Sequence, residues 1–442
     1  MTTTPHARPA PPAPTLADRL AVGALLGVQD LSLRALALAG DPVARWSLGS
    51  PRTDVYALYE RIRRRGPVVR SRTGVHALTS AELCEQVLRD PTFGVRPAGH
   101  ADGAGDRTDP VARIALPPTV TGSFLEMDPP DHTRLRRTVA PAFRPRVVRE
   151  RAPRLEALLH GLVDRIEDRA RRGEHFDVMA DLAAPFPIAV ISDLLGVPEA
   201  DAARFRAIGN TVGQALDGVR TLRQVDRLRT AGLELEELFA RLLDERAAEP
   251  RDDVLSVVAA ARAAGTATGR EALETAGLLL VAGFETTVNL IGNGIAALAA
   301  HPQWWERLVA EPDLAPRVVE ETLRFDPSVQ ATSRIAHADT TLAGTALPAG
   351  STVLVLTAAA NRDPAAHPRP AVFDPLRTGE PDHLTFSSGI HFCLGTPLAR
   401  LEGEIAFRVL AQRLPRLRLL PGARRRAGAV IRGYATLPAT AR

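Results

Sequence analysis

The chain has 442 residues, 45% of them hydrophobic, so it can bury a large core and is not an intrinsically disordered protein. Its 55 basic residues are all arginine and are offset by 51 acidic ones, which leaves a net charge of +4 and argues against nucleic acid as a partner. Two cysteines in a chain of this length exclude a disulfide framework and favour a reducing, cytoplasmic compartment.

The first 15 residues, MTTTPHARPAPPAPT, are rich in Thr, Pro and Ala and lack the basic-then-apolar layout of a secretory signal. We expect them to form a disordered arm. The LAVGALLGVQ run that follows covers about ten residues, roughly half a bilayer span, and charged residues flank it, so we expect no membrane segment. Residues 16–442 contain no repeat and no linker, which predicts a single domain.

Periodicity predicts a mainly α-helical fold with a minor β portion. Residues 54–93 alternate helical patterns (VYALYERIRRR, SAELCEQVLRD) with short strands (PVVRSRT, VHALT). Residues 94–121 are rich in Gly, Pro and Asp without periodicity, which predicts a long functional loop. The pattern is mainly helical from 132 to 324, and the last hundred residues mix strands, proline-rich turns and one long helix.

The segment LLLVAGFETTVNLIGNG, residues 278–294, predicts an apolar helix whose uncharged run is too short to span a membrane. It carries Glu285 and Thr286 in its middle. A carboxylate in such a setting is costly unless it is paired, hydrated or used chemically, and Gly283 leaves room for a ligand. The structural alternative is a helix bent by an intrahelical threonine hydrogen bond, with Glu285 in a salt bridge.

The stretch FSSGIHFCLG, residues 386–395, places Cys393 on a glycine-flanked turn just before a helical pattern. The positive end of that helix is expected to lower the thiol pKa and favour a thiolate, which suits a soft metal. Zinc normally takes three or four protein ligands, whereas haem iron needs only one. A nucleophile or a small apolar filler are the other interpretations of Cys393.

The pattern Phe-x-x-Gly-x-His-x-Cys-x-Gly in this stretch resembles the cysteine-ligand loop of cytochromes P450 of the soluble bacterial type. Three further segments, AGFET (282–286), VVEETLRF (318–325) and MDPPDHTRLRR (127–137), resemble other motifs of that family. The likeness covers the chain from about Asp41 onward. It implies the P450 fold, with haem b between the long central helix and the cysteine-ligand loop, Cys393 thiolate as the axial ligand and O2 as co-substrate.

The resemblance assigns roles to single residues. Glu285 and Thr286 are the implied catalytic proton relay. The implied haem contacts are His132, Arg136, Ala282, Gly283, Arg334, Phe386, Gly389, His391 and Gly395. Glu321, Arg324 and Arg377 are the implied structural network, although a Glu-x-x-Arg pair alone is common on surfaces. The implied substrate contacts are Phe124, Leu279, Ala282, Val329, Ala331 and Tyr434. Ser387 departs from the pattern, because that position is usually glycine.

The implied activity is a haem-thiolate monooxygenase that hydroxylates or epoxidises a bulky, largely apolar small molecule of the polyketide or macrolide type. A fatty acid, terpenoid or steroid is the alternative substrate, and a peroxide-dependent peroxygenase or a non-catalytic haem-binding protein is the alternative class. The chain has no glycine-rich dinucleotide fingerprint and no iron–sulfur cysteine cluster, so electrons are expected from a ferredoxin and its reductase. An acidic ferredoxin is expected near Arg134, Arg137 and Arg144, and the enzyme is expected to be a monomer.

Overall fold

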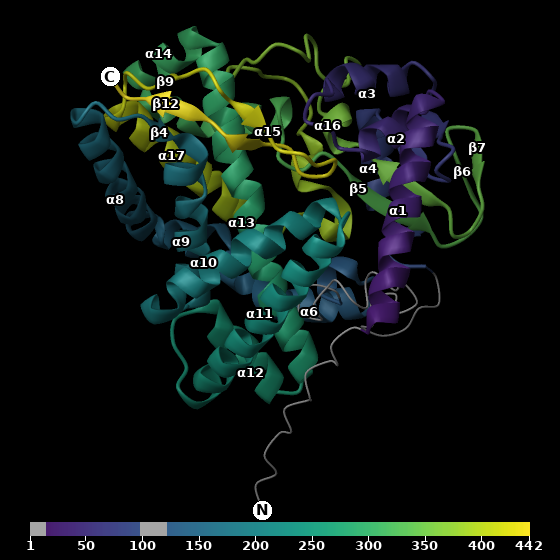
Figure 1. Ribbon diagram of the computed structural model, residues 1–442, viewed down its shortest axis with the longest axis horizontal. Helices are drawn as coiled ribbons and strands as arrows, with labels where there is room; N and C mark the ends of the chain where they lie inside the picture. The colour runs from purple at the N-terminus through teal and green to yellow at the C-terminus, as the bar shows by residue number, and fades with distance from the viewer. Residues whose placement is uncertain (1–14, 98–121) are drawn as a thin grey trace, which may run out of the picture.

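The computed structural model describes residues 15–97 and 122–442, in which a large helical part lies beside a smaller part built around a β-sheet (Figure 1). The central element is α13 (Gly269–Ala300), the longest helix described. The other helices of the helical part are α6 (Asp131–Val139), α7 (Pro145–Glu150), α8 (Ala152–Arg171), α9 (Pro185–Leu195), α10 (Glu199–Gly213), α11 (Leu222–Ala248), α12 (Val254–Ala263), α14 (Pro302–Ala310), α15 (Ala315–Phe325) and α17 (Thr396–Arg413).

The sheet part holds a five-stranded sheet with strand order β1-β2-β8-β5-β3. Its strands are β1 (Val68–Arg70), β2 (His76–Leu78), β3 (Phe93–Gly94), β5 (Thr332–Ala336) and β8 (Thr352–Val355). β2 and β8 run parallel, whereas the neighbouring pairs β1–β2, β5–β8 and β3–β5 are antiparallel. Short helices accompany this sheet, namely α2 (Pro42–Ser47), α3 (Val55–Arg63), α4 (Ala81–Arg89) and α16 (Thr357–Ala360).

Three small sheets complete the strand inventory of the described residues. They are the hairpin β6 (Thr340–Leu342) with β7 (Thr345–Leu347), the hairpin β10 (Arg424–Arg425) with β11 (Tyr434–Thr436), and the set β4 (Phe176–Asp177), β12 (Pro438–Thr440) and β9 (Arg418–Leu419). In the last set the C-terminal strand β12 pairs with both β4 and β9, so the end of the chain is fixed to the helical part.

The position of α13 in the core follows from its composition. A capping box of Thr268 and Glu271 starts the helix, and apolar or small side chains then cover most of its surface. Gly294 lets α17 cross closely, because a Cβ there would lie 2.2 Å from Cζ of Phe407. α13 and α17, the helix that follows the turn with Cys393, are therefore held against each other by core packing.

The N-terminal helix α1 (Leu16–Leu38) extends on both sides of the ten-residue apolar run LAVGALLGVQ. Thr15 and Asp18 form a capping box at its start, and Arg19 pairs with Asp226 of α11 at 2.6 Å. By length and composition alone both α1 and α13 could cross a bilayer, so the expectation that the two apolar runs are too short is wrong. The apolar window of α13 is 78% buried inside the protein, whereas that of α1 is 11% buried.

The predicted fold class, mainly α with a minor β portion, is confirmed. The helices and strands expected in residues 54–93 appear as α3, β1, β2 and α4. The helix expected over 278–294 is part of the longer α13. The predicted disordered arm, apart from its last residue, and most of the predicted loop lie outside the described residues.

Candidate active site

The cysteine-ligand loop lies between the 3-10 turn η6 (Leu384–Phe386) and α17, with a second 3-10 turn, η7 (Gly389–His391), between them. The Cys393 amide donates to the carbonyl of Phe386 at 2.8 Å, and the Thr396 hydroxyl donates to the carbonyl of Cys393 at 2.9 Å. Gly389 has φ +70°, and a Cβ there would lie 2.4 Å from the carbonyl oxygen of Leu88. Only glycine fits this position, so the loop is held in one shape.

The pKa of the Cys393 thiol is raised overall, so the expectation of a thiolate favoured by the helix end is not met, although the amides at that end do lower the pKa. Burial is the largest cause, and hydrogen bonds from the amides of Gly395 and Thr396 offset it only in part. The residue nevertheless retains accessible surface. Ligation to a metal ion favours the thiolate over the thiol, so the loop and a bound iron stabilise each other.

A group of buried hydrogen-bond donors without partners lies next to this loop. The rings of His132 on α6 and His391 have centroids 4.4 Å apart. Among the described residues, neither ring nitrogen of His132, nor Nε2 of His391, nor Nη2 of Arg334 on β5 has a hydrogen-bond partner. Burial and the charges of His132, Arg334 and Arg136 lower the pKa of His391 to about 3.

Uncompensated donors in a buried, electropositive setting fit an anionic group with several acceptor oxygens. The two propionates of haem have this chemistry, and Cys393 offers the single axial ligand that haem iron needs. Residues 15–97 and 122–442 contain no cluster of three or more His, Cys, Asp or Glu side chains arranged to bind a metal. The residues present therefore fit haem.

The middle of α13 is accessible although the helix is otherwise mostly buried. Ala282 is exposed and Gly283, Glu285 and Thr286 are half-buried, whereas the residues on either side are mainly buried. The Thr286 hydroxyl donates to the carbonyl of Ala282 at 2.8 Å, and Glu285 forms an ion pair with Arg426. Both features of the structural alternative, the intrahelical threonine hydrogen bond and the salt bridge of Glu285, are thus present. The same stretch of α13 is also accessible, as ligand binding requires.

Glu321, Arg324 and Arg377 lie together in the interior. Arg324 contacts both carboxylate oxygens of Glu321, at 2.7 and 2.8 Å, and Nε of Arg377 lies 3.2 Å from Glu321. Arg324 also donates to the carbonyls of Asn361, Pro370 and Val372. The trio therefore joins α15 to the long irregular segment that leads to the cysteine-ligand loop.

The predicted substrate contacts are only partly brought together. Phe124 packs at 6.3 Å from the ring of His132, and both Phe124 and Leu279 belong to the main core cluster. Tyr434 and Glu285 line one open cavity of about 420 Å³. Val329 bridges to Ile431, whereas Ala331 packs with Trp46 and Leu58 in a separate cluster of the sheet part. Of the predicted functional loop, residues 98–121 lie outside the described residues.

Sequence reasoning missed the partners of Glu285. Arg426 and Asn289 both contact its carboxylate, and Arg426 also contacts Asp217. Two signals were available in the sequence: Asn289 lies four residues after Glu285 on an apolar helix, and Arg426 belongs to an uninterrupted arginine triplet. The spacing of Asn289 places it one helical turn from Glu285, whereas nothing local identifies Arg426 as a partner, because it is far from Glu285 in the chain.

Comparison with known proteins agrees with this geometry. The family described as Cytochrome P450 matches residues 95–416. The chain is 39% identical over 373 residues to the cytochrome P450 monooxygenase PikC of Streptomyces venezuelae, covering 83% of this chain and 85% of the relative.

Two solved structures share the fold. The first is the cytochrome P450 enzyme CxnD for C–S bond formation in chuangxinmycin biosynthesis, with TM-score 0.80, 32% identity, and 89% of this chain and 96% of the other covered. The second is PksS, the cytochrome P450 of the Bacillus subtilis bacillaene polyketide synthase, with TM-score 0.76, 30% identity, and coverages of 88% and 96%. The chain therefore belongs to the cytochrome P450 family, whose members are monooxygenases that use O2 and haem held by a cysteine thiolate.

Proposed function

We propose that this monooxygenase hydroxylates or epoxidises a bulky, largely apolar molecule of the polyketide or macrolide type, with Cys393 as its haem ligand. The observation that carries the assignment of the site is the set of buried, unpartnered donors of His132, His391 and Arg334 beside the cysteine-ligand loop. Support for the substrate class comes from the similarity to PksS, which is named for a polyketide synthase. The predicted substrate contacts are also mostly apolar or small.

Hydroxylation breaks a C–H bond, inserts one oxygen atom of O2 and reduces the other to water, with the uptake of two electrons and two protons. Haem supplies the oxygen-activating chemistry when bound. The chain supplies orientation and protons. Gly283 lets α9 pack closely on α13, because a Cβ there would lie 3.1 Å from Cδ1 of Ile191, so it does not provide the ligand space expected from the sequence. Thr286, which donates to Ala282, keeps its lone pairs free to accept a hydrogen bond. Glu285 passes protons inward from the accessible side of the helix.

Electrons come from a ferredoxin and its reductase in this proposal. The cysteine-ligand loop exposes Ile390 and Phe392, which are 51% and 43% accessible, and Arg137 and Arg144 are exposed on neighbouring segments. An apolar centre with a basic rim suits an acidic protein partner. Arg134 contributes less than the sequence suggested, because it is paired with Asp131 and Glu271.

In the same proposal residues 16–442 form one catalytic domain that works as a cytoplasmic monomer. The family match lies inside this range, and the main core cluster runs from Phe124 to Ala439. Sedimentation of the haem-loaded protein tests the oligomeric state: a single species of about 47 kDa is expected, and a dimer contradicts the proposal.

The electron source separates this function from its alternatives. A panel of macrolactones, fatty acids, terpenoids and steroids is incubated with the protein and either NADPH with ferredoxin and reductase, or hydrogen peroxide. Oxidation of a macrolactone that requires NADPH and both partners is expected. Turnover with peroxide alone identifies a peroxygenase, selective oxidation of another class changes the substrate assignment, and binding without oxidation identifies a haem-binding protein.

The ligand assignment is tested by the reduced, carbon-monoxide-bound absorption spectrum. Cys393→Ser is expected to lose the long-wavelength Soret band of a haem thiolate, and Cys84→Ala, the other cysteine of the chain, is expected to keep it because Cys84 is buried in a separate core cluster. A retained band in Cys393→Ser refutes the assignment.

A further inference from the structure

A polar stripe on α13 attaches the C-terminal hairpin (residues 424–436) to the helix. The stripe consists of Glu285, Asn289 and Asn293, spaced by one helical turn on an otherwise apolar surface. Asn289 lies against the backbone of Gly433, where a Cβ would come within 1.6 Å of its Oδ1. Asn293 donates to the carbonyl of Arg432 at 3.1 Å and accepts from Arg425 at 3.1 Å. The hairpin register on α13 is thus fixed at three successive turns.

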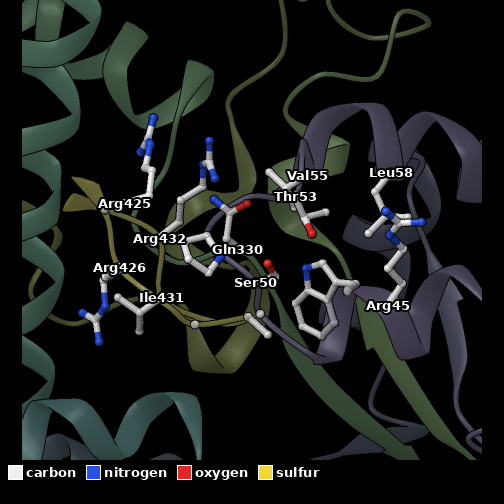
Figure 2. Close-up of a pocket in the computed structure, with 16 residues that line it drawn as sticks. Arg45, Ser50, Thr53, Val55, Leu58, Gln330, Arg425, Arg426, Ile431 and Arg432 are labelled. Atoms are coloured by element: carbon white, nitrogen blue, oxygen red, sulfur yellow. The ribbon is translucent and has the colours of Figure 1, made fainter. Parts of the chain in front are cut away.

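Arg426 joins this stripe to a third segment, the turn between α10 and α11 (residues 214–221). One end of its guanidinium pairs with Glu285, and Nη2 lies 3.2 Å from Oδ2 of Asp217 in that turn. Figure 2 shows Arg426 pointing to the opposite side of the hairpin from Arg425 and Arg432. Those two arginines serve a different carboxylate, Asp326, at 2.8 and 2.7 Å. Of Arg425, Arg426 and Arg432, it is Arg426 that pairs with Glu285.

Asp217 also holds the hairpin through its backbone. Its Oδ1 accepts hydrogen bonds from the amides of Val430 and Ile431, each at 2.9 Å. Gly213, at the end of α10, lies against the other side of Glu285, since a Cβ there would be 2.9 Å from Oε2. The α10–α11 turn, the hairpin and the acid of α13 consequently meet at one place.

The meeting point borders the open cavity of about 420 Å³, whose lining includes Asp217, Glu285, Arg426 and Tyr434. One guanidinium serves two carboxylates there, and all three side chains are at most 15% exposed. Removing the cation leaves two buried carboxylates that repel each other, which is much more costly than the loss of a surface pair. The position of the α10–α11 turn and the direction of Glu285 are therefore linked through Arg426.

We propose that Arg426 is a positioning residue that ties the proton-delivering acid Glu285 to the α10–α11 turn at the cavity mouth, so that movement of the turn and proton delivery are coupled. This inference rests on the relay role proposed above for Glu285. When the turn moves away, Arg426 loses Asp217 and pairs with Glu285 alone, which holds the acid away from the relay. When the turn is docked, Arg426 is shared and Glu285 is released more easily.

The first test needs no turnover. Amide hydrogen exchange of the haem-loaded protein is compared for the wild type, Arg426→Gln, Arg426→Lys and the control Arg424→Gln, an exposed arginine on the same hairpin whose side chain bonds to Thr436. Arg426→Gln is expected to speed exchange at residues 428–431 and 216–221 about tenfold, with partial recovery in Arg426→Lys. Unchanged exchange in Arg426→Gln, or equal acceleration in Arg424→Gln, overturns the link.

The second test measures the solvent isotope effect on product formation and the fraction of reducing equivalents recovered as product. Arg426→Gln is expected to change both quantities in a background with Glu285 and to add nothing in a Glu285→Gln background. Equal effects in the two backgrounds show that Arg426 does not act through Glu285. If Glu285→Gln alone changes neither quantity, the relay role fails, and the exchange experiment still decides whether Arg426 links the three segments.

Discussion

The rings of His132 and His391 lie 4.4 Å apart, although one belongs to α6 and the other precedes the C-terminal helix α17. The His132 nitrogens are buried and have no partner among the described residues. Two such rings beside Arg334 form the part of the site that suits an anion.

Replacing His132 with Phe is expected to weaken haem binding about 10- to 100-fold, because each hydrogen bond to a charged group contributes about 1.5–3 kcal/mol. Competition with apomyoglobin for haem measures the change. His301→Phe is the control, since His301 stacks on Phe373 away from the loop. Equal haem affinity in the two variants contradicts the anion-binding role.

Ser387 is held in a backbone conformation that suits glycine, with φ 65° and ψ −166°. Its hydroxyl is buried and has no partner among residues of the described chain. Ser387→Gly is therefore expected to raise the free energy of unfolding by about 1 kcal/mol or more. Ser388→Gly, at φ −149°, is expected to lower it, because glycine there only increases the entropy of the unfolded chain. Denaturant unfolding of both variants checks the sign.

Glu274 on α13 makes stability depend on pH. Burial raises its pKa to about 7, although Arg270 hydrogen-bonds to it at 2.6 Å and opposes the shift. Between its ordinary value of 4.5 and about 7 the folded state binds the extra proton, so stability falls as pH rises through this range, by up to about 3 kcal/mol.

Glu274→Gln is expected to flatten this pH dependence in denaturant unfolding curves. Glu271→Gln is the matched variant, because the Glu271 carboxylate is expected to change stability with pH in the opposite direction. Burial raises the pKa of Glu271, but hydrogen bonds from Arg134 and Thr268 outweigh it and lower the pKa overall, so the carboxylate stabilises the fold above its ordinary pKa. Parallel pH profiles for Glu274→Gln and the wild type refute the assignment.

Gly433 permits the contact between the C-terminal hairpin and Asn289. Gly433→Ala is expected to lower the free energy of unfolding by about 1–3 kcal/mol, because the hairpin must move away from α13. Gly161→Ala in α8 is the control: nothing lies within 4 Å of its Cβ, so helix propensity predicts a gain of about 0.5–1 kcal/mol. If both substitutions change the free energy of unfolding in the same direction, the close contact between the hairpin and α13 is contradicted.

The sequence by itself determined the family and the fold class, and it predicted the residues that we propose hold haem, because motifs such as FSSGIHFCLG need particular residue types at fixed short spacings. The sequence also identified the structural network of Glu321, Arg324 and Arg377. The residue types within each motif and the order of the motifs along the chain were enough for these assignments.

Only the tertiary structure decided which side chain neutralises Glu285 and in which direction the pKa of the Cys393 thiol shifts. Arg426 and Asp217 reach Glu285 through the packing of a hairpin and a turn that are far from it in the chain, and no local pattern specifies such a contact. The helix end beside Cys393 predicted a lowered pKa, but burial raises it, because the desolvation that opposes charge comes from the surrounding fold. The start of α1 is likewise marked by its cap at Thr15, outside the apolar run, and its first turn is held by the contact of Arg19 with Asp226.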